Sequence, residues 1–353
     1  MKGKVNLTLF IGFSKIEAIK SLQLMKFVTT KMLGMKIIKM LWACLVLIAM
    51  NSFSQKVQKA AFQVVPLGVK GGIDEKNLSA YLVAPSNTKD YICLDAGTIN
   101  SGIEKAIENK VFRASASEVL RKYIKGYLIS HAHLDHVSGL IINSPADSSK
   151  TVYATNGCIE MMENHYFNDK TWANFGDQGV GLPLKKYHFQ TLNFNEETPI
   201  TNTQMTVKAF SLSHVNPYES TAFLIKNGND YALYLGDTGP DAVEKTNNLQ
   251  ELWTAIAPLI RSKQLKGIFI EVSFPNEQPD QFLFGHLTPK YLMQELHELE
   301  KLAGKNSLNG FKIVITHLKP PAKNIVKIKE QLKTENDLGL KFIFPEQGKS
   351  FEL

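Results

Sequence analysis

Four potential metal ligands lie within six consecutive residues of this 353-residue chain: His131, His133, Asp135 and His136. The apolar segment 123–130 before them predicts a buried strand, and the apolar run 140–142 after Gly139 predicts a helix. A turn between a strand and a helix allows alternate side chains to point into one concave site. Histidine and carboxylate ligands without a nearby cysteine pair favour a hydrolytic zinc-type site over a structural one. The alternative is a chance cluster of polar loop residues.

Three further candidate ligands lie downstream, each just after a predicted strand. His214 follows the alternating segment 205–213, Asp237 follows the segment 231–236, and His317 follows the segment 311–316. A polar residue at the C-terminal end of a strand can reach a cavity at the edge of a sheet. Each of these residues alone would fit a capping role equally well, but together with the first cluster they predict a site for two metal ions.

We expect these ligands to form two groups. The first is His131, His133 and His214, the second is Asp135, His136 and His317, and Asp237 would bridge the two metals. Two metal ions about 3.5–4 Å apart can share a hydroxide and stabilise an in-line displacement at phosphorus. The ligand pattern therefore predicts a hydrolase with a dinuclear site.

The longer string 131–145, HAHLDHVSGLIINSP, resembles the signature of the class II cyclic-nucleotide phosphodiesterases, a family of the metallo-β-lactamase superfamily. That signature has an HxHLDH core, a small residue, an aliphatic run, and then Ser-Pro or Ser-Ala. The short superfamily motif is common among hydrolases, whereas the extended string is more specific. The resemblance runs from Phe62 to the C-terminus through GGIDEKNLSAYLV (71–83), ICLDAGT (92–98), YLGDTGPD (234–241) and GHLTP (285–289).

The resemblance implies hydrolysis of 3',5'-cyclic nucleotides to 5'-nucleotides. The implied cofactors are two divalent metal ions, with Zn²⁺ favoured and Mn²⁺ or Fe²⁺ as alternatives. A metal-bridging hydroxide would attack the cyclic phosphate, with Asp135 serving catalysis as a ligand. His286 would protonate the leaving 3'-oxygen, and Glu271 would orient and charge its imidazole. A helix-start role before Thr288 and Pro289 is the alternative for His286.

Other activities of the same fold are kept as hypotheses. A lactonase or thioesterase would use the same ligands but would not need Glu271 and His286 to protonate a phosphate ester. A ribonuclease Z-like nuclease would need a basic arm to hold RNA, and the sequence has none. A binding protein on an inactive hydrolase scaffold would not be expected to keep seven ligands.

The net charge of the chain is concentrated at its N-terminus. The whole chain carries +7, but residues 1–54 contain eight Lys and a single acidic residue, Glu17. Without that segment 32 basic and 32 acidic residues remain. A neutral body attracts polyanions poorly, so we expect a small nucleotide and not a nucleic acid as the partner. A homodimer is compatible with the sequence, although no feature argues for it.

The segment 35–54 has the three-part pattern of a secretory signal peptide. A short basic region at Met35 precedes the apolar run 40–50, which is too short to span a bilayer, and small residues precede Gln55. We therefore predict an exported, periplasmic or secreted protein without a stable membrane anchor, in which residues 1–34 are an upstream extension or the result of a mis-assigned start. An uncleaved N-terminal membrane anchor is the alternative.

Residues 55–353 are predicted to form a single α/β catalytic domain, without a Pro/Ser-rich linker or a repeat. Strands are expected near 62–68, 79–84 and 91–97, and again near 206–212, 221–227, 231–236, 266–271 and 312–316. This two-part pattern fits two sheets packed face to face with helices outside, the four-layer αββα sandwich that the metallo-β-lactamase resemblance also implies. The segment 321–336 predicts an amphipathic surface helix.

The segment 164–177 is the predicted substrate pocket. Asn164 could read the edge of a base, and Phe167 or Trp172 could stack on it; a packed loop that covers the sheet is the alternative. Asp95 and Thr98 are expected to support the metal-site loops by hydrogen bonds. Two cysteines remain after cleavage, Cys93 and Cys158, and we expect no disulfide between them.

Overall fold

The computed structural model describes residues 20–27, 29–32 and 60–353, and its contacts divide the chain into units 1–59 and 60–353. In the first unit, residues 20–27 and 29–32 are helical. The predicted signal peptide, 35–54, lies outside the described residues. Within the described ranges, no helix has the length and apolar character needed to cross a bilayer. The catalytic domain predicted from the sequence corresponds to the second unit, described from residue 60 onwards.

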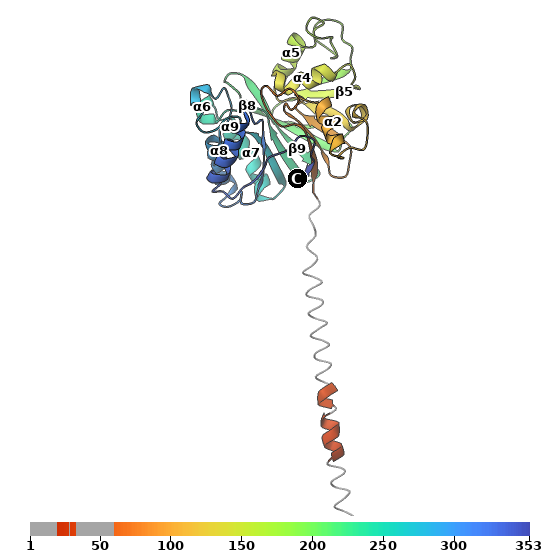
Figure 1. Cartoon of the computed structure of the whole chain (residues 1–353), viewed down its shortest axis with the longest axis vertical. Helices are drawn as coiled ribbons and strands as arrows, with labels where there is room; N and C mark the ends of the chain where they lie inside the picture. Colours follow the sequence, from red (N-terminus) through yellow and green to blue (C-terminus); the bar gives the residue numbers. More distant parts are fainter. Residues whose placement is uncertain (1–19, 28, 33–59) are drawn as a thin grey trace, which may run out of the picture. The chain divides into compact units, whose positions relative to one another are not determined.

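Two seven-stranded sheets form the centre of the second unit (Figure 1). Their strand orders are β14-β1-β2-β3-β4-β5-β6 and β13-β12-β11-β10-β9-β8-β7. The first sheet contains β1 (Phe62–Gly68), β2 (Ala80–Pro85), β3 (Tyr91–Leu94), β4 (Ile124–Leu128), β5 (Lys150–Ala154), β6 (Tyr187–Thr191) and β14 (Phe351–Glu352). The second contains β7 (Glu197–Pro199), β8 (Met205–Ser213), β9 (Glu219–Asn227), β10 (Asp230–Leu235), β11 (Leu265–Glu271), β12 (Lys312–Thr316) and β13 (Lys341–Ile343).

Helices cover the outer face of each sheet (Figure 1). On the first sheet lie α2 (Asn100–Glu108), α4 (Leu134–Asn143) and α5 (Asn156–His165), with the short α3 (Ala116–Glu118) and the π-helical η1 (Val119–Tyr123). On the second lie α6 (Asp241–Glu244), α7 (Asn248–Arg261), α8 (Pro289–Ala303) and α9 (Ala322–Glu335), with the 3-10 turn η2 (Asp280–Phe282). The predicted four-layer αββα arrangement is confirmed, as is the surface helix predicted for 321–336.

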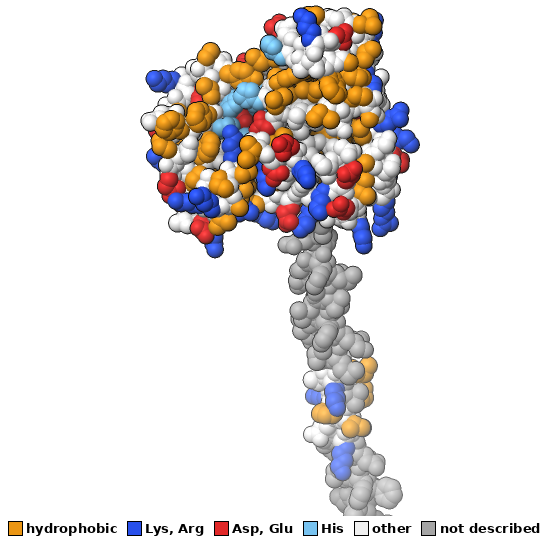
Figure 2. All heavy atoms as spheres, turned by 45° about the horizontal axis from the view of Figure 1, so that its top comes forward, with side chains coloured by type: hydrophobic (Ala, Val, Ile, Leu, Met, Phe, Trp, Pro, Cys, Tyr) orange, Lys and Arg blue, Asp and Glu red, His pale blue; other side chains and the backbone are white. Residues whose placement is uncertain are grey.

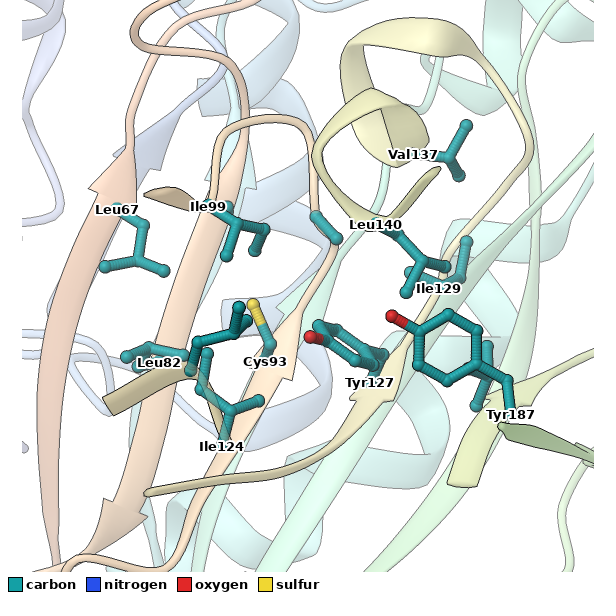
Figure 3. Packing of buried hydrophobic residues seen from close by; sticks show 14 of the residues in the cluster. Leu67, Leu82, Cys93, Ile99, Ile124, Tyr127, Ile129, Val137, Leu140 and Tyr187 are labelled. Atoms are coloured by element: carbon teal, nitrogen blue, oxygen red, sulfur yellow. The ribbon is translucent and has the colours of Figure 1, made fainter. Parts of the chain in front are cut away.

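Because side chains alternate between the two faces of each strand, the buried hydrophobic residues form three clusters: one between the sheets and one under the helices of each sheet. Side chains on the inner faces of both sheets interdigitate, as where the Phe269 ring meets Tyr81 edge-on at a centroid distance of 5.6 Å. Side chains on the opposite face of the first sheet pack under α2, α4 and α5, and Figure 3 shows Cys93, Tyr127 and Leu140 in this layer. The two cysteines of the described unit are buried free thiols.

The strand directions bring several strand ends to one edge. Strands β10, β11 and β12 run parallel, and β8 shares their direction because both β8 and β10 are antiparallel to β9. In the first sheet, β3 and β4 are also parallel. The hydroxyl of Tyr234 on β10 donates to Oδ2 of Asp95, just beyond β3, at 2.6 Å, which ties the edges of the two sheets together. The predicted metal ligands lie at this junction.

Candidate metal centre and active site

The first ligands lie at the turn between β4 and α4, as the sequence predicted. His131 and His133 precede the helix, and His133 occupies its N-cap position. Asp135 and His136 lie in the first turn, where the amide of His136 donates to the carbonyl of His133 at 3.0 Å. A carboxylate in the first turn is favoured by the partial positive charge of a helix N-terminus. The turn therefore directs four donor groups from one short segment toward the edge of the sheets.

The second sheet supplies the remaining donors from its strand ends. His214 follows β8 directly, His317 follows β12 directly, and Asp237 lies two residues beyond β10. His317 has a φ of +54°, and Asp95 has a φ of +51°. Such left-handed conformations are unfavourable for residues other than glycine and cluster at functional sites. Figure 2 shows the histidine side chains gathered at one place on the surface, with hydrophobic side chains beside them.

The first predicted group of ligands is assembled in the structure. Nε2 of His131 lies 3.1 Å from Nδ1 of His133, and Nε2 of His214 lies 3.3 Å from the same atom. His131 and His214 are buried, whereas His133 is exposed and its ring stacks on Tyr218 at a centroid distance of 4.8 Å. These three nitrogens lie close enough together to bind one metal ion.

The second group lies beside the first, with Asp237 between them. Oδ2 of Asp135 is 3.1 Å from Nε2 of His317, and the His136 and His317 rings stack at 5.1 Å. Oδ2 of Asp237 lies 3.2 Å from Nε2 of His317 and 3.3 Å from Nε2 of His136, and 3.9 Å from Nε2 of His131. The carboxylate therefore reaches both groups, although metal binding by these seven residues stays a prediction.

Hydrogen bonds behind the rings set the tautomers. Nδ1 of His136 donates to Oδ2 of Asp95 at 2.7 Å, and Nδ1 of His214 donates to the carbonyl of Gly285 at 2.8 Å. Because Nδ1 of each ring is committed to these partners, Nε2 is the nitrogen that faces the centre of the cluster. Partners of this kind orient metal-ligating imidazoles and increase their basicity.

Serines play the same part for two further rings, those of His131 and His317. The hydroxyl of Ser130 donates to Asp95 and lies 3.0 Å from Nδ1 of His131. The hydroxyl of Ser273 donates to Oε2 of Glu271 and lies 3.0 Å from Nδ1 of His317. With their own protons committed to carboxylates, both hydroxyls accept from the imidazoles, which again leaves Nε2 free.

Asp95 and Thr98 differ in what they support. Asp95 accepts hydrogen bonds from Ser130, His136 and Tyr234, so it supports the ligands as predicted. The hydroxyl of Thr98 instead accepts from the amide of Leu78 and donates to the carbonyl of Glu75. Thr98 therefore holds the loop that carries Gly71 and Gly72, and within residues 60–353 its hydroxyl forms no hydrogen bond with a predicted ligand.

The electrostatics of the cluster suit a divalent cation. Burial lowers the pKa of His131 well below its usual range and that of His133 to about 4, so both rings are neutral at pH 7. Burial alone would raise the pKa of Asp237, but the surrounding imidazoles, His136 foremost, hold it well below its usual range. Burial would lower the pKa of His136, but the Asp237 and Asp95 carboxylates raise it well above its usual range, so metal binding at its buried Nε2 would displace a proton. The neutral His131 and His133 rings and the ionised Asp237 carboxylate are donors that suit a zinc-type ion.

The backbone at Gly71 passes close to the His317 ring. A Cβ on Gly71 would lie 2.1 Å from Cε1 of His317, so only glycine allows this loop to pass beside the ring. The neighbouring amide of Gly72 donates to Oδ2 of Asp135 at 3.0 Å. The loop therefore confines one ligand and holds a second in place.

Glu271, His286 and Lys319 form a hydrogen-bonded series beside the cluster. Nδ1 of His286 donates to Oε1 of Glu271 at 2.6 Å, and Nζ of Lys319 lies 2.7 Å from Nε2 of His286. The predicted orientation of His286 by Glu271 is present. The predicted charging is opposed, because burial first and then the Lys319 ammonium lower the pKa of His286, while burial raises that of Glu271 to about 7.

The predicted substrate pocket is not assembled in the structure. Phe167 is completely buried against Tyr187 and Phe189, so its prediction as a base-stacking residue is wrong, and the packed-loop alternative applies. Trp172 donates through Nε1 to Ser144 at the C-terminal end of α4, about 15 Å along the helix from the ligands at its start. Asn164 is exposed on α5 and contributes its backbone carbonyl to Asn168. Within residues 60–353, none of these three side chains forms a hydrogen bond or ring contact with a predicted metal ligand.

Sequence analysis missed four residues whose side chains the structure brings to the site: Ser130, Ser273, Tyr218 and Lys319. Ser273 and Lys319 each lie two residues beyond a predicted site residue, Glu271 and His317 respectively, where a polar side chain after a strand was the available signal. Tyr218 offered no such signal, since its stacking on His133 depends on the path of the loop after β8.

Comparison with solved structures identifies the fold. The chain is similar to the metallo-beta-lactamase fold protein YhfI from Bacillus subtilis, with a TM-score of 0.56 and 16% identity over 82% of this chain and 99% of that one. It is more similar to unliganded yeast PDE1, with a TM-score of 0.74 and 24% identity over 83% of this chain and 100% of that one. These similarities identify the chain as a protein of the metallo-β-lactamase fold.

Sequence comparison identifies the family. A model of the class-II cAMP phosphodiesterases matches residues 53–348. The 3',5'-cyclic-nucleotide phosphodiesterase of Aliivibrio fischeri is 42% identical over 318 residues, which cover 86% of this chain and 96% of that protein. The chain belongs to the class-II cyclic-nucleotide phosphodiesterase family, and the family resemblance seen in the sequence is confirmed.

The hydrogen bond from His136 to Asp95 predicts a dependence of metal affinity on a residue that is not a ligand. Replacing Asp95 with Asn should weaken zinc binding by about 10- to 100-fold, because the imidazole loses its carboxylate partner. Competition with a chromophoric zinc chelator measures this affinity. The matched control is Asp177→Asn, which removes the carboxylate from the surface pair with His188. Equal affinities for the two variants would contradict the role of Asp95.

Proposed function

We propose that this chain hydrolyses 3',5'-cyclic nucleotides to 5'-nucleotides with two divalent metal ions. Family membership supports the reaction. The proposal of two metal ions rests on the position of the Asp237 carboxylate. Its Oδ2 lies within 4.0 Å of Nε2 atoms from both predicted ligand groups. One carboxylate between two sets of imidazoles has the arrangement of a bridging ligand.

The seven predicted ligands would hold the metals in the two groups expected from the sequence. His131, His133 and His214 would hold one ion, Asp135, His136 and His317 the other, and Asp237 would bridge them. Divalent ions in such a site supply positive charge to the phosphoryl oxygens and activate water as the nucleophile. Imidazole and carboxylate donors favour zinc, with manganese or iron as alternatives.

His286 is the proposed proton donor to the leaving 3'-oxygen, and Glu271 holds its ring. The 2.6 Å hydrogen bond fixes Nδ1 on the carboxylate and directs Nε2 away from it. The pair is buried, so a proton held by Glu271 and His286 is shielded from solvent. Because the ring is neutral with its proton on Nδ1, Nε2 would first have to take up a proton, and the attacking water would release one as it adds to phosphorus. Lys319 has to leave Nε2 for this, because its ammonium donates to the same lone pair.

The bridging role of Asp237 predicts the effect of its loss. The Asp237→Asn variant should hydrolyse cAMP and cGMP at least about 100-fold more slowly than the wild type, since a neutral amide cannot neutralise and hold two cations. Formation of 5'-nucleotide is measured with zinc supplied, together with the zinc content, and Asp177→Asn serves as the control. Bound metal without cleavage of either nucleotide by the wild type would overturn the proposed reaction and direct attention to lactones, thioesters and other phosphodiesters.

The proton-donor role predicts that the need for His286 depends on the leaving group. The His286→Gln variant should lose about 10²- to 10⁴-fold in kcat on cAMP, whose 3'-alkoxide needs a proton. On bis(p-nitrophenyl) phosphate the loss should be small, because p-nitrophenolate leaves without protonation. Steady-state rates on both substrates test this, and equal losses on both would show that His286 does not act as the acid.

We also propose that residues 35–54 are a signal peptide and that the mature enzyme is exported. The basic region, apolar run and small residues before Gln55 support this. N-terminal sequencing of protein from the periplasmic or extracellular fraction should give a chain that begins at Gln55. Recovery of the enzyme in the membrane fraction with residues 1–54 still attached would instead establish the anchored alternative.

A further inference from the structure

Lys319 is a half-buried cation at the edge of the metal cluster. It lies two residues beyond His317, at the C-terminal end of β12, where Leu318 pairs with Lys70 in an isolated bridge. Its stem passes beside the glycine loop, since a Cβ on Gly72 would lie 4.0 Å from Cγ of Lys319. Its Nζ lies 5.3 Å from the centroid of the Phe274 ring. Loop, ring and backbone together direct the ammonium toward the cluster.

The charge of Lys319 is not paired with a carboxylate. Across residues 60–353, no carboxylate oxygen forms a salt bridge with its Nζ, and the one hydrogen bond of the ammonium goes to Nε2 of His286. That nitrogen belongs to a neutral ring whose other nitrogen donates to Glu271. An ammonium has three N–H donors, so at least two remain available. A partly desolvated cation with free donors is suited to an anionic ligand.

The position of Lys319 relative to the ligands identifies that anion. The His286 ring, which Lys319 contacts, stacks on the His317 ring with a centroid distance of 5.2 Å and an interplanar angle of 20°. Nδ1 of His286 is 3.8 Å from Oδ2 of Asp237. One imidazole therefore separates the ammonium from the predicted metal ligands. A phosphodiester held by those metals would present its remaining oxygens to this side.

We propose that Lys319 contacts a phosphoryl oxygen of the cyclic nucleotide and is a catalytic residue of the hydrolysis. This inference rests on the proposed function. The phosphoryl group gains negative charge as the nucleophile adds, and a fixed cation beside it stabilises that charge in the transition state. The same contact draws the ammonium away from Nε2 of His286, which leaves that nitrogen free to serve the leaving oxygen.

The experiment compares Lys319→Gln and Lys319→Arg with His286→Gln in the full chain loaded with zinc. A matched control is Lys329→Gln, because Lys329 also lies over an aromatic ring, that of Phe344, but on the exposed side of α9. The readouts are kcat and KM on cAMP and on bis(p-nitrophenyl) phosphate, competitive inhibition by 5'-AMP, and zinc content.

Lys319→Gln should lower kcat/KM on both substrates by about 10- to 100-fold, and it should weaken inhibition by 5'-AMP about 10-fold or more. Zinc content should stay unchanged, and Lys319→Arg should recover most of the loss because it restores the charge. The loss on both substrates distinguishes Lys319 from His286, whose loss should fall mainly on cAMP.

Three results would overturn the inference. A loss confined to cAMP would mean that Lys319 acts only by positioning His286, and unchanged inhibition by 5'-AMP would mean that it does not contact phosphate. If the wild type cleaves bis(p-nitrophenyl) phosphate but not cyclic nucleotides, the proposed function fails. The rates of the variants on bis(p-nitrophenyl) phosphate then still decide the role of Lys319. Lost zinc in Lys319→Gln, not restored in Lys319→Arg, would assign it a purely structural role.

Discussion

One buried carboxylate, that of Asp237, governs the organisation of this site. Its Oδ2 lies within 4.0 Å of ring nitrogens from five histidines: His131, His136, His214, His286 and His317. An ionised carboxylate in a buried position is strongly unfavourable unless opposite charge compensates it. Four of those rings direct Nε2 toward the carboxylate, and divalent cations bound by these nitrogens would compensate its charge. Both ligand groups and the neighbouring Glu271–His286 pair are arranged around that requirement.

The metal cluster depends on both sheets at once. Asp95 extends from the first sheet and accepts hydrogen bonds from His136 beside it and from Tyr234 of the second sheet. The relative position of the sheets is maintained by the core between them, where Phe269 packs against Tyr81 and Tyr234. The packing between the sheets therefore affects the distances between ligands that come from different sheets, because a close-packed core transmits small displacements.

Much of the fold could be predicted because strands carry local patterns. The strand predicted at 62–68 is present as β1 with the same bounds, and the helix predicted at 321–336 is present as α9, 322–335. The turn that holds His131 to His136 was predictable for the same reason, since its strand and helix flank it directly. The substrate pocket was not predictable. The segment 164–177 has no regular hydrophobic pattern, so its sequence does not reveal which aromatic side chains face the core. Phe167 fills the core for that reason, while Tyr218 reaches the site.

By itself the sequence determined the two-sheet class, the family, and the seven residues predicted to bind metal, because short motifs and strand ends carry that information. Tertiary structure alone decided which nitrogen of His136, His214 and His317 faces the cluster, since the groups that accept from Nδ1, on Asp95, Gly285 and Ser273, come from distant parts of the chain. It also decided that Lys319 meets His286, from 33 residues away, where no carboxylate of residues 60–353 forms a salt bridge with it. Such contacts depend on how parallel strands align at one edge, and no local pattern encodes that alignment.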